Sequence, residues 1–236
     1  MTKKRPVPDN LSRAVLEELY GSRPFIEAYR EHTDRLVAHD PQIAVGGLWE
    51  EIGKLQFDYL VANGLRPEHR LLDIGCGTMR GGRHFIRYLG AGNYTGFDLS
   101  AASIEAARRI VAAEGLTSKR PNLYVDGERL DLRLAQGQKF DFLLAQSVFT
   151  HLPEDDIAIC CRALHTVMEK HSKFFFTFDD PVDFEGQRKP LHVFYHPFDV
   201  FERLAAECDL TVERRFDYPH PRNQSMAVLS LRASIP

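Results

Sequence analysis

The chain has 236 residues, a length typical of one large domain or of one domain with an appended segment. Lysine and arginine total 30 against 33 aspartates and glutamates. The resulting formal net charge of −3 lacks the basic surplus of a protein that mainly coats nucleic acid. Hydrophobic residues make up 44% of the chain, which is enough for a sizeable core and too much for a disordered chain.

Cysteine usage and hydrophobic runs indicate a protein of a reducing compartment. Among Cys76, Cys160, Cys161 and Cys208, no pair has the C-x-x-C spacing of a zinc ribbon or a thioredoxin-type motif. The first ten residues are charged and interrupted by prolines, unlike a secretory signal. The longest apolar runs have the length of strands and not of membrane spans. We therefore expect a cytoplasmic protein without a membrane segment.

Three helices are predicted before residue 65. Apolar residues recur there at helical spacing, first at Leu11, Val15 and Leu19, then at Phe25, Tyr29, Leu36 and Val37, and then at Leu48, Ile52, Leu55 and Tyr59. The second helix is expected to end near Asp40, and Gly64 is placed to cap the third. We treat residues 1–65 as a helical cap or lid, separate from a main domain over residues 66–236.

From residue 70 onward, short apolar strands alternate with helices. Strands are predicted at Arg70–Ile74, Asn93–Asp98, Asn122–Asp126, Phe140–Ala145, Lys173–Phe178, Leu210–Phe216 and Ser225–Leu231, and helices at Ala101–Ala113, Pro153–Lys170 and Pro197–Cys208. This alternation is typical of a mostly parallel, doubly wound α/β sheet. The connection Asp217–Gln224 is too short for a crossover helix, so the last two strands should pair antiparallel.

The most informative stretch runs from Leu71 to Gly82, where a buried strand leads into a glycine turn that opens a helix. Gly75 and Gly77 allow the main chain to bend sharply and a ligand to lie against its N–H groups. In an open α/β sheet, ligands bind just outside the carboxyl ends of the strands. Glycines in such a turn can also serve the turn alone, so a ligand site requires further residues.

Carboxylates at the ends of the next two predicted strands supply such residues. Asp98 follows the glycines by about 20 residues, the spacing at which an acidic side chain reaches ribose hydroxyls. Asp126 ends the third strand and is placed to accept a hydrogen bond from an adenine amino group. Capping or turn formation is the competing interpretation for both, most strongly for Asp126 because Gly127 follows it.

Two residues around the glycine turn discriminate between nucleotide ligands. The G-x-G-x-x-G fingerprint of dinucleotide sites requires a glycine where this sequence has Arg80, which disfavours NAD and FAD. Asp73, two residues before the first glycine, would repel a pyrophosphate. The same carboxylate suits a cationic sulfonium ligand that also carries an amino group.

In combination, these segments resemble the class I S-adenosylmethionine-dependent methyltransferases of the small-molecule type. The resemblance is carried by Leu71–Gly77 (LLDIGCG), Tyr94–Ser100 (YTGFDLS) and Phe140–Pro153 (FDFLLAQSVFTHLP), and it spans about residues 48–180. It implies a Rossmann-like seven-stranded sheet of order 3-2-1-4-5-7-6 with the last strand antiparallel. Residues 66–236 would form the methyltransferase domain, with S-adenosylmethionine as cofactor and S-adenosylhomocysteine as product.

The resemblance also implies roles for single residues. The two glycines of the turn would pass the methionine and ribose moieties, and the carboxylates that end the second and third strands would hold the ribose and border the adenine. Asp73 would contact the methionine amino group, and Gln146 would lie under the cofactor near the acceptor. The implied cofactor-binding set is Asp73, Gly75, Cys76, Gly77, Asp98, Leu99, Asp126, Gly127 and Gln146.

The end of the fourth strand differs from one branch of this family. The amino-directed nucleic-acid and glutamine methyltransferases have an Asn/Asp-Pro-Pro-aromatic tetrad where this sequence has Gln146-Ser147-Val148-Phe149. This difference disfavours methylation of a base nitrogen and, with the net charge, favours a small-molecule acceptor over nucleic acid. An RNA or protein acceptor, or nucleotide binding without catalysis, is the alternative. The sequence determines neither the acceptor nor the oligomeric state.

His151 is the candidate catalytic base for methylation of a hydroxyl oxygen, the reaction that we favour. It lies in the loop after the fourth strand, at the cofactor-facing end of the sheet, although helping to start the helix at Pro153 is a competing role. The long segment Asp179–Pro197, with His192, is expected to form part of the acceptor pocket or a plain surface loop. Adjacent carboxylates at a strand end are mostly solvated or capping, so Asp179 and Asp180 predict no metal.

Overall fold

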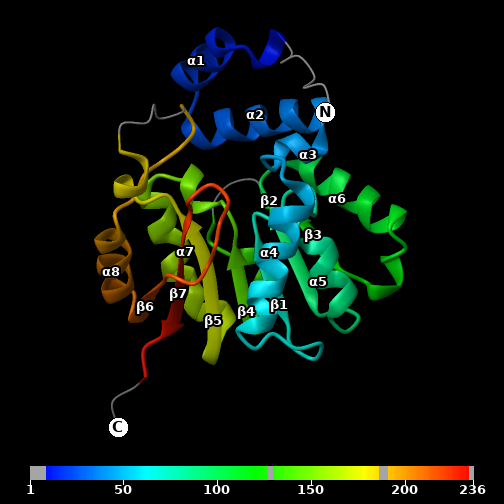
Figure 1. Ribbon diagram of the computed structural model, residues 1–236, viewed down its shortest axis with the longest axis vertical. Helices are drawn as coiled ribbons and strands as arrows, with labels where there is room; N and C mark the ends of the chain where they lie inside the picture. Colours follow the sequence, from blue (N-terminus) through cyan, green and yellow to red (C-terminus); the bar gives the residue numbers. More distant parts are fainter. Residues whose placement is uncertain (1–8, 127–129, 186–190, 234–236) are drawn as a thin grey trace.

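The computed structural model describes residues 9–126, 130–185 and 191–233 (Figure 1). Its centre is a seven-stranded sheet of order β3-β2-β1-β4-β5-β7-β6, which confirms the predicted topology. The strands are β1 (Leu71–Ile74), β2 (Tyr94–Asp98), β3 (Asn122–Val125), β4 (Phe140–Ala145), β5 (Met168–Phe178), β6 (Leu210–Arg215) and β7 (Ser225–Leu231). From β3 to β5 all neighbours are parallel, whereas β7 is antiparallel to both β5 and β6.

The predicted end of one helix and the predicted start of the following strand, Lys173, are wrong. The helix expected over Pro153–Lys170 ends earlier, because α7 (Glu154–Val167) gives way to β5 at Met168, which pairs with Phe140 of β4. The pairing of β4 and β5 is then irregular, and the Ser172 hydroxyl donates to the Phe140 carbonyl at 2.6 Å within it. The irregularity breaks the alternation of apolar and polar residues by which a strand is recognised, so the start of β5 is hidden in the sequence.

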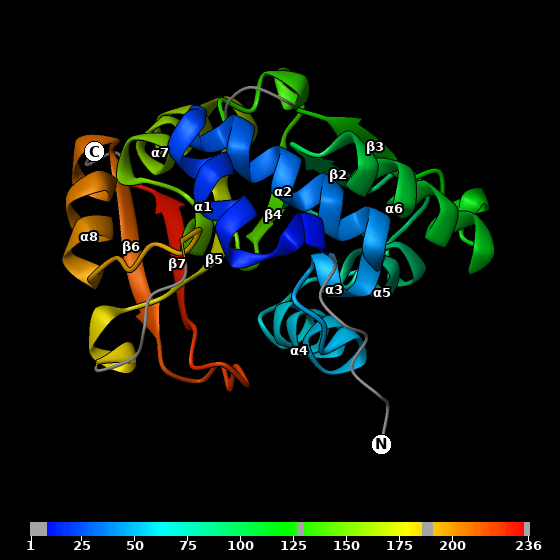
Figure 2. The same ribbon diagram turned by 90° about the horizontal axis from the view of Figure 1, so that it is seen from above.

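Helices cover both faces of the sheet (Figures 1 and 2). One face carries α4 (Trp49–Ala62), α5 (Gly82–Tyr88) and α6 (Ala101–Ala113), and the other carries α7 and α8 (Phe198–Glu207). Neighbouring residues of β5 serve opposite faces, since Phe175 packs with the first layer and Phe174 and Phe176 pack with the second. Among the described residues, no helix combines the length and apolarity needed to cross a bilayer.

The N-terminal elements lie across one end of the sheet, at the top of Figure 1. They are η1 (Asp9–Leu11), α1 (Arg13–Ser22), α2 (Phe25–His39) and α3 (Pro41–Ala44), whereas α4 packs on a face of the sheet. The Ser100 hydroxyl, just after β2, donates to Asp34 of α2 at 2.5 Å. The Thr78 hydroxyl donates to the Pro41 carbonyl at 2.7 Å. These bonds fasten the helices to the carboxyl ends of β1 and β2.

Short 3₁₀ turns complete the secondary structure. They are η2 (Thr117–Lys119), η3 (Arg133–Ala135), η4 (Phe149–His151) and η5 (Pro181–Phe184). Two of them directly follow strand ends, since η4 comes after β4 and η5 after β5. Both therefore lie at the end of the sheet over which α2 passes.

Candidate functional site

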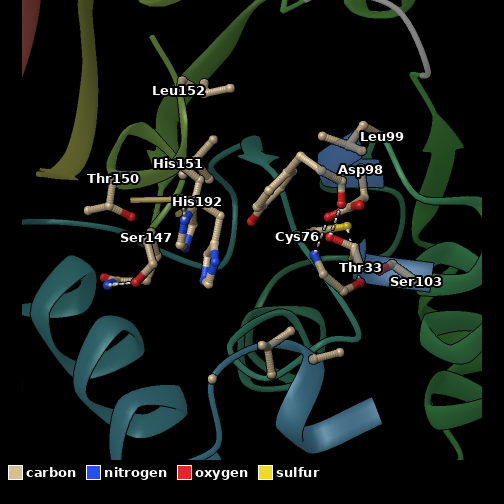
Figure 3. A pocket seen from close by; sticks show the side chains of 18 of the residues that line it. Thr33, Cys76, Asp98, Leu99, Ser103, Ser147, Thr150, His151, Leu152 and His192 are labelled. Atoms are coloured by element: carbon tan, nitrogen blue, oxygen red, sulfur yellow. Dashed lines mark hydrogen bonds between the residues drawn. The ribbon is translucent and has the colours of Figure 1, made fainter. Parts of the chain in front are cut away.

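A cavity of about 460 Å³ lies at the carboxyl ends of the parallel strands, beneath α2 (Figure 3). Its lining includes all the described residues of the predicted site, namely Asp73, Gly75, Cys76, Gly77, Asp98, Leu99, Asp126, Gln146 and His151. Gly127 lies outside the described residues. Residues that are far apart in the sequence thus meet in one place, as the topology of an open sheet requires.

The labelled side chains of the cavity form two groups in Figure 3. Cys76, Asp98, Leu99, Ser103 and Thr33 lie on one side, and Ser147, Thr150, His151 and His192 on the other. We call the first side, with the glycine turn, the glycine-turn end, and the second the histidine end. The order of the strands explains the division, because the first side follows β1 and β2 and the second follows β4 and β5.

The glycine turn is shaped by backbone conformation and by crowding. Gly75 and Gly77 have φ angles of +67° and +56°, which residues with a side chain rarely adopt. A Cβ on Gly75 would lie 2.6 Å from Val148, and one on Gly77 would lie 2.5 Å from Val45. Any larger residue would displace these neighbours and fill the crevice.

Asp98 is held at the edge of this crevice by main-chain donors. The Gly77 N–H donates to Asp98 Oδ2 at 3.0 Å, and the Ser100 N–H donates to Oδ1 at 2.9 Å. Each carboxylate oxygen has a further lone pair for a ligand hydroxyl. Burial raises the pKa of Asp98 to about 6, although the two N–H donors act in the opposite direction.

Asp73 is the second carboxylate near the turn and is only 4% exposed. It accepts a hydrogen bond of 2.6 Å from the Tyr94 hydroxyl. Burial raises its pKa to about 7, and the charge of Asp98 adds to the rise. A cationic group bound between these two carboxylates would therefore favour their ionised forms.

Gln146 lies at the end of β4 within a buried hydrogen-bond network. Its Oε1 accepts from the Tyr218 hydroxyl at 2.7 Å, and its Nε2 donates to Gln224 Oε1 at 3.3 Å. The next residue, Ser147, donates its N–H to Thr177 Oγ1 at 2.7 Å. These contacts fix the amide of Gln146 on the cavity wall, between the two ends.

His151 has a defined tautomer. Its Nδ1 lies 2.7 Å from the His192 carbonyl oxygen, which can only accept, so Nδ1 carries the proton and Nε2 keeps its lone pair. Burial lowers the pKa of His151 to about 4, so the ring is neutral at pH 7. The ring stacks on Tyr29 and on His192, with centroid separations of 5.2 and 5.4 Å. His151 is therefore an uncharged, oriented imidazole.

Helix α2 supplies lining residues that the sequence did not single out as a site. Tyr29, His32 and Thr33 project from it into the cavity. The ring of His32 lies 5.0 Å from that of His192, and its Nδ1 lies 3.1 Å from the Tyr20 hydroxyl oxygen. With Leu36 these residues share one face of the helix, but the same spacing is equally typical of plain core packing.

The long segment after β5 contributes to the histidine end, as one of its two predicted interpretations required. His192 lines the cavity, whereas His196 is buried beside it, with Nε2 2.9 Å from the Leu152 carbonyl oxygen. The neighbouring carboxylates point to different partners. Asp180 pairs with Arg214 at 2.8 Å, and Asp179 lines the cavity. Within residues 9–126, 130–185 and 191–233, no cluster of His, Cys, Asp or Glu has the arrangement of a metal site.

Comparison with known proteins identifies the central part of the chain. Residues 71–171 match the sequence model of a methyltransferase domain. Curated relatives include a probable fatty acid methyltransferase of Pseudomonas putida (34% identical over 111 residues) and the ubiquinone biosynthesis O-methyltransferase of Haemophilus ducreyi (30% over 117 residues). The indolepyruvate C-methyltransferase of Streptomyces griseus is 29% identical over 181 residues. The alignments cover 46%, 48% and 71% of this chain.

These relatives are longer than the region that they share with this chain. The alignments cover 27%, 48% and 52% of their lengths, so the chain spans about half of them or less. Among solved structures, magnesium protoporphyrin IX methyltransferase of Synechocystis, with bound S-adenosylhomocysteine, superposes with a TM-score of 0.64. The superposition covers 89% of this chain and 100% of that chain at 16% identity, and so concerns the fold.

Proposed function

Because this chain belongs to the class I S-adenosylmethionine-dependent methyltransferase family, we propose that it transfers a methyl group from S-adenosylmethionine to a hydroxyl oxygen of a small molecule. The proposal rests on the observation that three features of the site lie in the same place. The glycine turn, the Asp98 carboxylate and the uncharged ring of His151 line a single cavity.

The glycine-turn end has the donor set and the shape that S-adenosylmethionine requires. Asp98 can accept from the ribose hydroxyls, and the buried carboxylate of Asp73 suits the methionine ammonium. Phe97, Leu99 and Leu130 supply apolar surface for the adenine. When bound, the cofactor supplies an electrophilic methyl group on a sulfonium, so the protein mainly has to align the acceptor and exclude water.

His151 is placed to accept the proton of the acceptor hydroxyl. Its Nε2 holds a lone pair because Nδ1 is engaged by the His192 carbonyl, and burial keeps the ring neutral. The bond to the carbonyl also fixes the plane of the ring. The proton would move from the hydroxyl to Nε2 as the oxygen–methyl bond forms and the bond between the methyl group and the sulfonium sulfur breaks, which would leave an uncharged ether oxygen and S-adenosylhomocysteine.

A small acceptor agrees with the position of the N-terminal helices. Within the predicted cap of residues 1–65, α1, α2 and α3 lie across the end of the sheet (Figure 2), and α2 forms part of the cavity wall. Bonds from Ser100 to Asp34 and from Thr78 to Pro41 hold them there. In the proposal, these helices act as a lid that must open for cofactor and acceptor exchange.

A methylation assay tests the proposal. The full chain is incubated with S-adenosylmethionine labelled in its methyl group and with a panel of hydroxylated small molecules, and NMR locates the label in each product. We expect label on an oxygen of at least one acceptor. Label on carbon alone would contradict the hydroxyl assignment, and the absence of any labelled product would contradict the proposed reaction.

A further inference from the structure

Asp179 follows β5 at the histidine end of the cavity. Strand β4 separates it from the glycine turn in the order of the sheet, β1-β4-β5. The residue lines the cavity but is only 6% exposed. Its Oδ1 has no hydrogen-bond partner among the described residues. A buried carboxylate oxygen without a donor is unfavourable, so the position calls for a donor that arrives from outside the chain.

The side chain of Gln224 forms a hydrogen bond with the Asp179 carboxyl, which leaves Oδ1 as its unpartnered oxygen among the described residues. Gln224 accepts with its Oε1 from Gln146, Ser147 and Thr177. The adjacent carboxylate of Asp180 is paired with Arg214. The two consecutive carboxylates therefore differ, since Asp180 belongs to a structural ion pair whereas Asp179 keeps one buried oxygen, Oδ1, without a partner among the described residues.

A second buried polar atom marks the same end. The Thr150 side chain is 1% exposed and lines the cavity, and its hydroxyl has no partner among the described residues. The cavity lining also includes rings and aliphatic groups, among them Tyr29, Leu152, Phe184 and Val193. The histidine end therefore combines an apolar surface with a few isolated polar groups, the usual composition of a small-molecule subsite.

The charges of the lining indicate the sign of the group that Asp179 would receive. Five carboxylates line the cavity, Asp73, Asp98, Asp126, Asp156 and Asp179, against two guanidinium groups. Both guanidinium groups donate to main-chain carbonyls, Arg80 to Val45 and Gly47 and Arg222 to Gly46. His32, His151 and His192 are kept uncharged, because burial lowers the pKa of each ring. The cavity lining as a whole therefore favours hydrogen-bond donors and cations over anions.

We infer that Asp179 is the specificity-determining residue for the acceptor, and that it receives a hydroxyl or ammonium group carried on an otherwise apolar molecule. The inference rests on the proposed function, because it places the acceptor at the histidine end. It narrows the substrate class to hydrogen-bond donors and excludes molecules that present a carboxylate or phosphate to this position. Burial raises the pKa of Asp179 to about 7, although the hydrogen bond from Gln224 acts in the opposite direction, and a bound cation would favour the ionised form.

Three probes with one ring and different charges test the inference. Binding of benzylamine, benzyl alcohol and benzoate to the full chain is measured by saturation-transfer NMR, with and without S-adenosylhomocysteine. We expect benzylamine or benzyl alcohol to bind and benzoate to bind roughly tenfold more weakly or not at all, as for a site built on a charged hydrogen-bond acceptor. Benzoate binding as tightly as the other two, or no binding of either donor probe, would overturn the inference.

Variants test whether the Asp179 side chain causes the preference among the three probes. Asp179→Asn, which keeps the shape and removes the charge, should weaken benzylamine binding by roughly tenfold. The matched control is Asp199→Asn, an exposed carboxylate of α8 outside the cavity lining, which should leave the order of the three probes unchanged. Equal benzylamine affinity in wild type and Asp179→Asn would refute the role of Asp179. Because probe binding is also measured without S-adenosylhomocysteine, a failure of the Asp179 inference can be told apart from a failure of cofactor binding. Cofactor binding itself is measured by a separate titration.

Discussion

The two ends of the cavity are built in different ways. The glycine-turn end is built mainly on the turn after β1 and the residue that ends β2, and its main carboxylate is held by main-chain N–H groups. The histidine end is assembled from three separate segments, α2, the loop after β4 and the segment after β5. The proposed cofactor site therefore depends mainly on backbone geometry, whereas the proposed acceptor site depends on the tertiary packing of side chains.

Replacing the proposed base should have the largest effect, and it should be confined to the histidine end. We expect His151→Gln to lower kcat by about 10²- to 10⁴-fold, the usual contribution of a general base, with little change in the Kd of S-adenosylhomocysteine. His165→Gln is the matched control, because His165 also bonds a main-chain carbonyl, that of Cys208, but does not line the cavity. Unchanged turnover in His151→Gln would leave this histidine with a structural role only.

Replacing the carboxylate of the glycine-turn end should instead weaken the binding of S-adenosylhomocysteine. Asp98→Ala should weaken S-adenosylhomocysteine more than tenfold, since hydrogen bonds to a charged group contribute about 1.5–3 kcal/mol. Calorimetry of the wild type and the variant measures this loss. Asp58→Ala on the exposed face of α4 serves as control, because Asp58 pairs with Lys54 at the surface and does not line the cavity. A variant that binds as tightly as the wild type would show that Asp98 does not hold the ribose.

The same end should also respond to pH. The pKa values of Asp73 and Asp98 are raised to about 7 and about 6, and the ionised forms are the ones that bind an ammonium and hydroxyls best. Affinity for S-adenosylhomocysteine should therefore be full at pH 8 and fall as the pH drops through 7 and 6, by roughly tenfold or more at pH 5. Titrations at several pH values check this, and a profile that is flat over this range would contradict it.

A smaller effect is expected from loosening the lid. Asp34→Ala removes the bond from Ser100 that ties α2 to the end of β2, and such a bond contributes about 0.5–1.5 kcal/mol. S-adenosylhomocysteine should then dissociate a few times faster, which stopped-flow measurement resolves. An unchanged dissociation rate would mean that release does not depend on this contact.

The fold was largely predictable because its signals are local. Alternating strands and helices indicated the parallel sheet, and the short connection before Ser225 indicated the antiparallel end. The error at Lys170 arose where an irregular pairing places polar residues in β5. Glu169 and Lys170 read as the last turn of a helix, and only the pairing with β4 shows that they belong to a strand.

The candidate site was predictable at one end and much less so at the other. The glycines and Asp98 lie within a short motif, so their spacing pointed to the crevice. Tyr29 and His32 on α2 reach the cavity only because that helix crosses the end of the sheet, and no local pattern shows such a placement. The separate roles of Asp179 and Asp180 depend on Arg214 of β6, which selects one of the two carboxylates.

Calorimetric titration of the full chain with S-adenosylhomocysteine determines whether the crevice beside the glycine turn binds the methyl donor. We expect one binding site per chain, with an affinity that depends on the carboxylate at the end of β2. Absence of any heat of binding at high micromolar ligand would contradict the assignment of this crevice to the methyl donor.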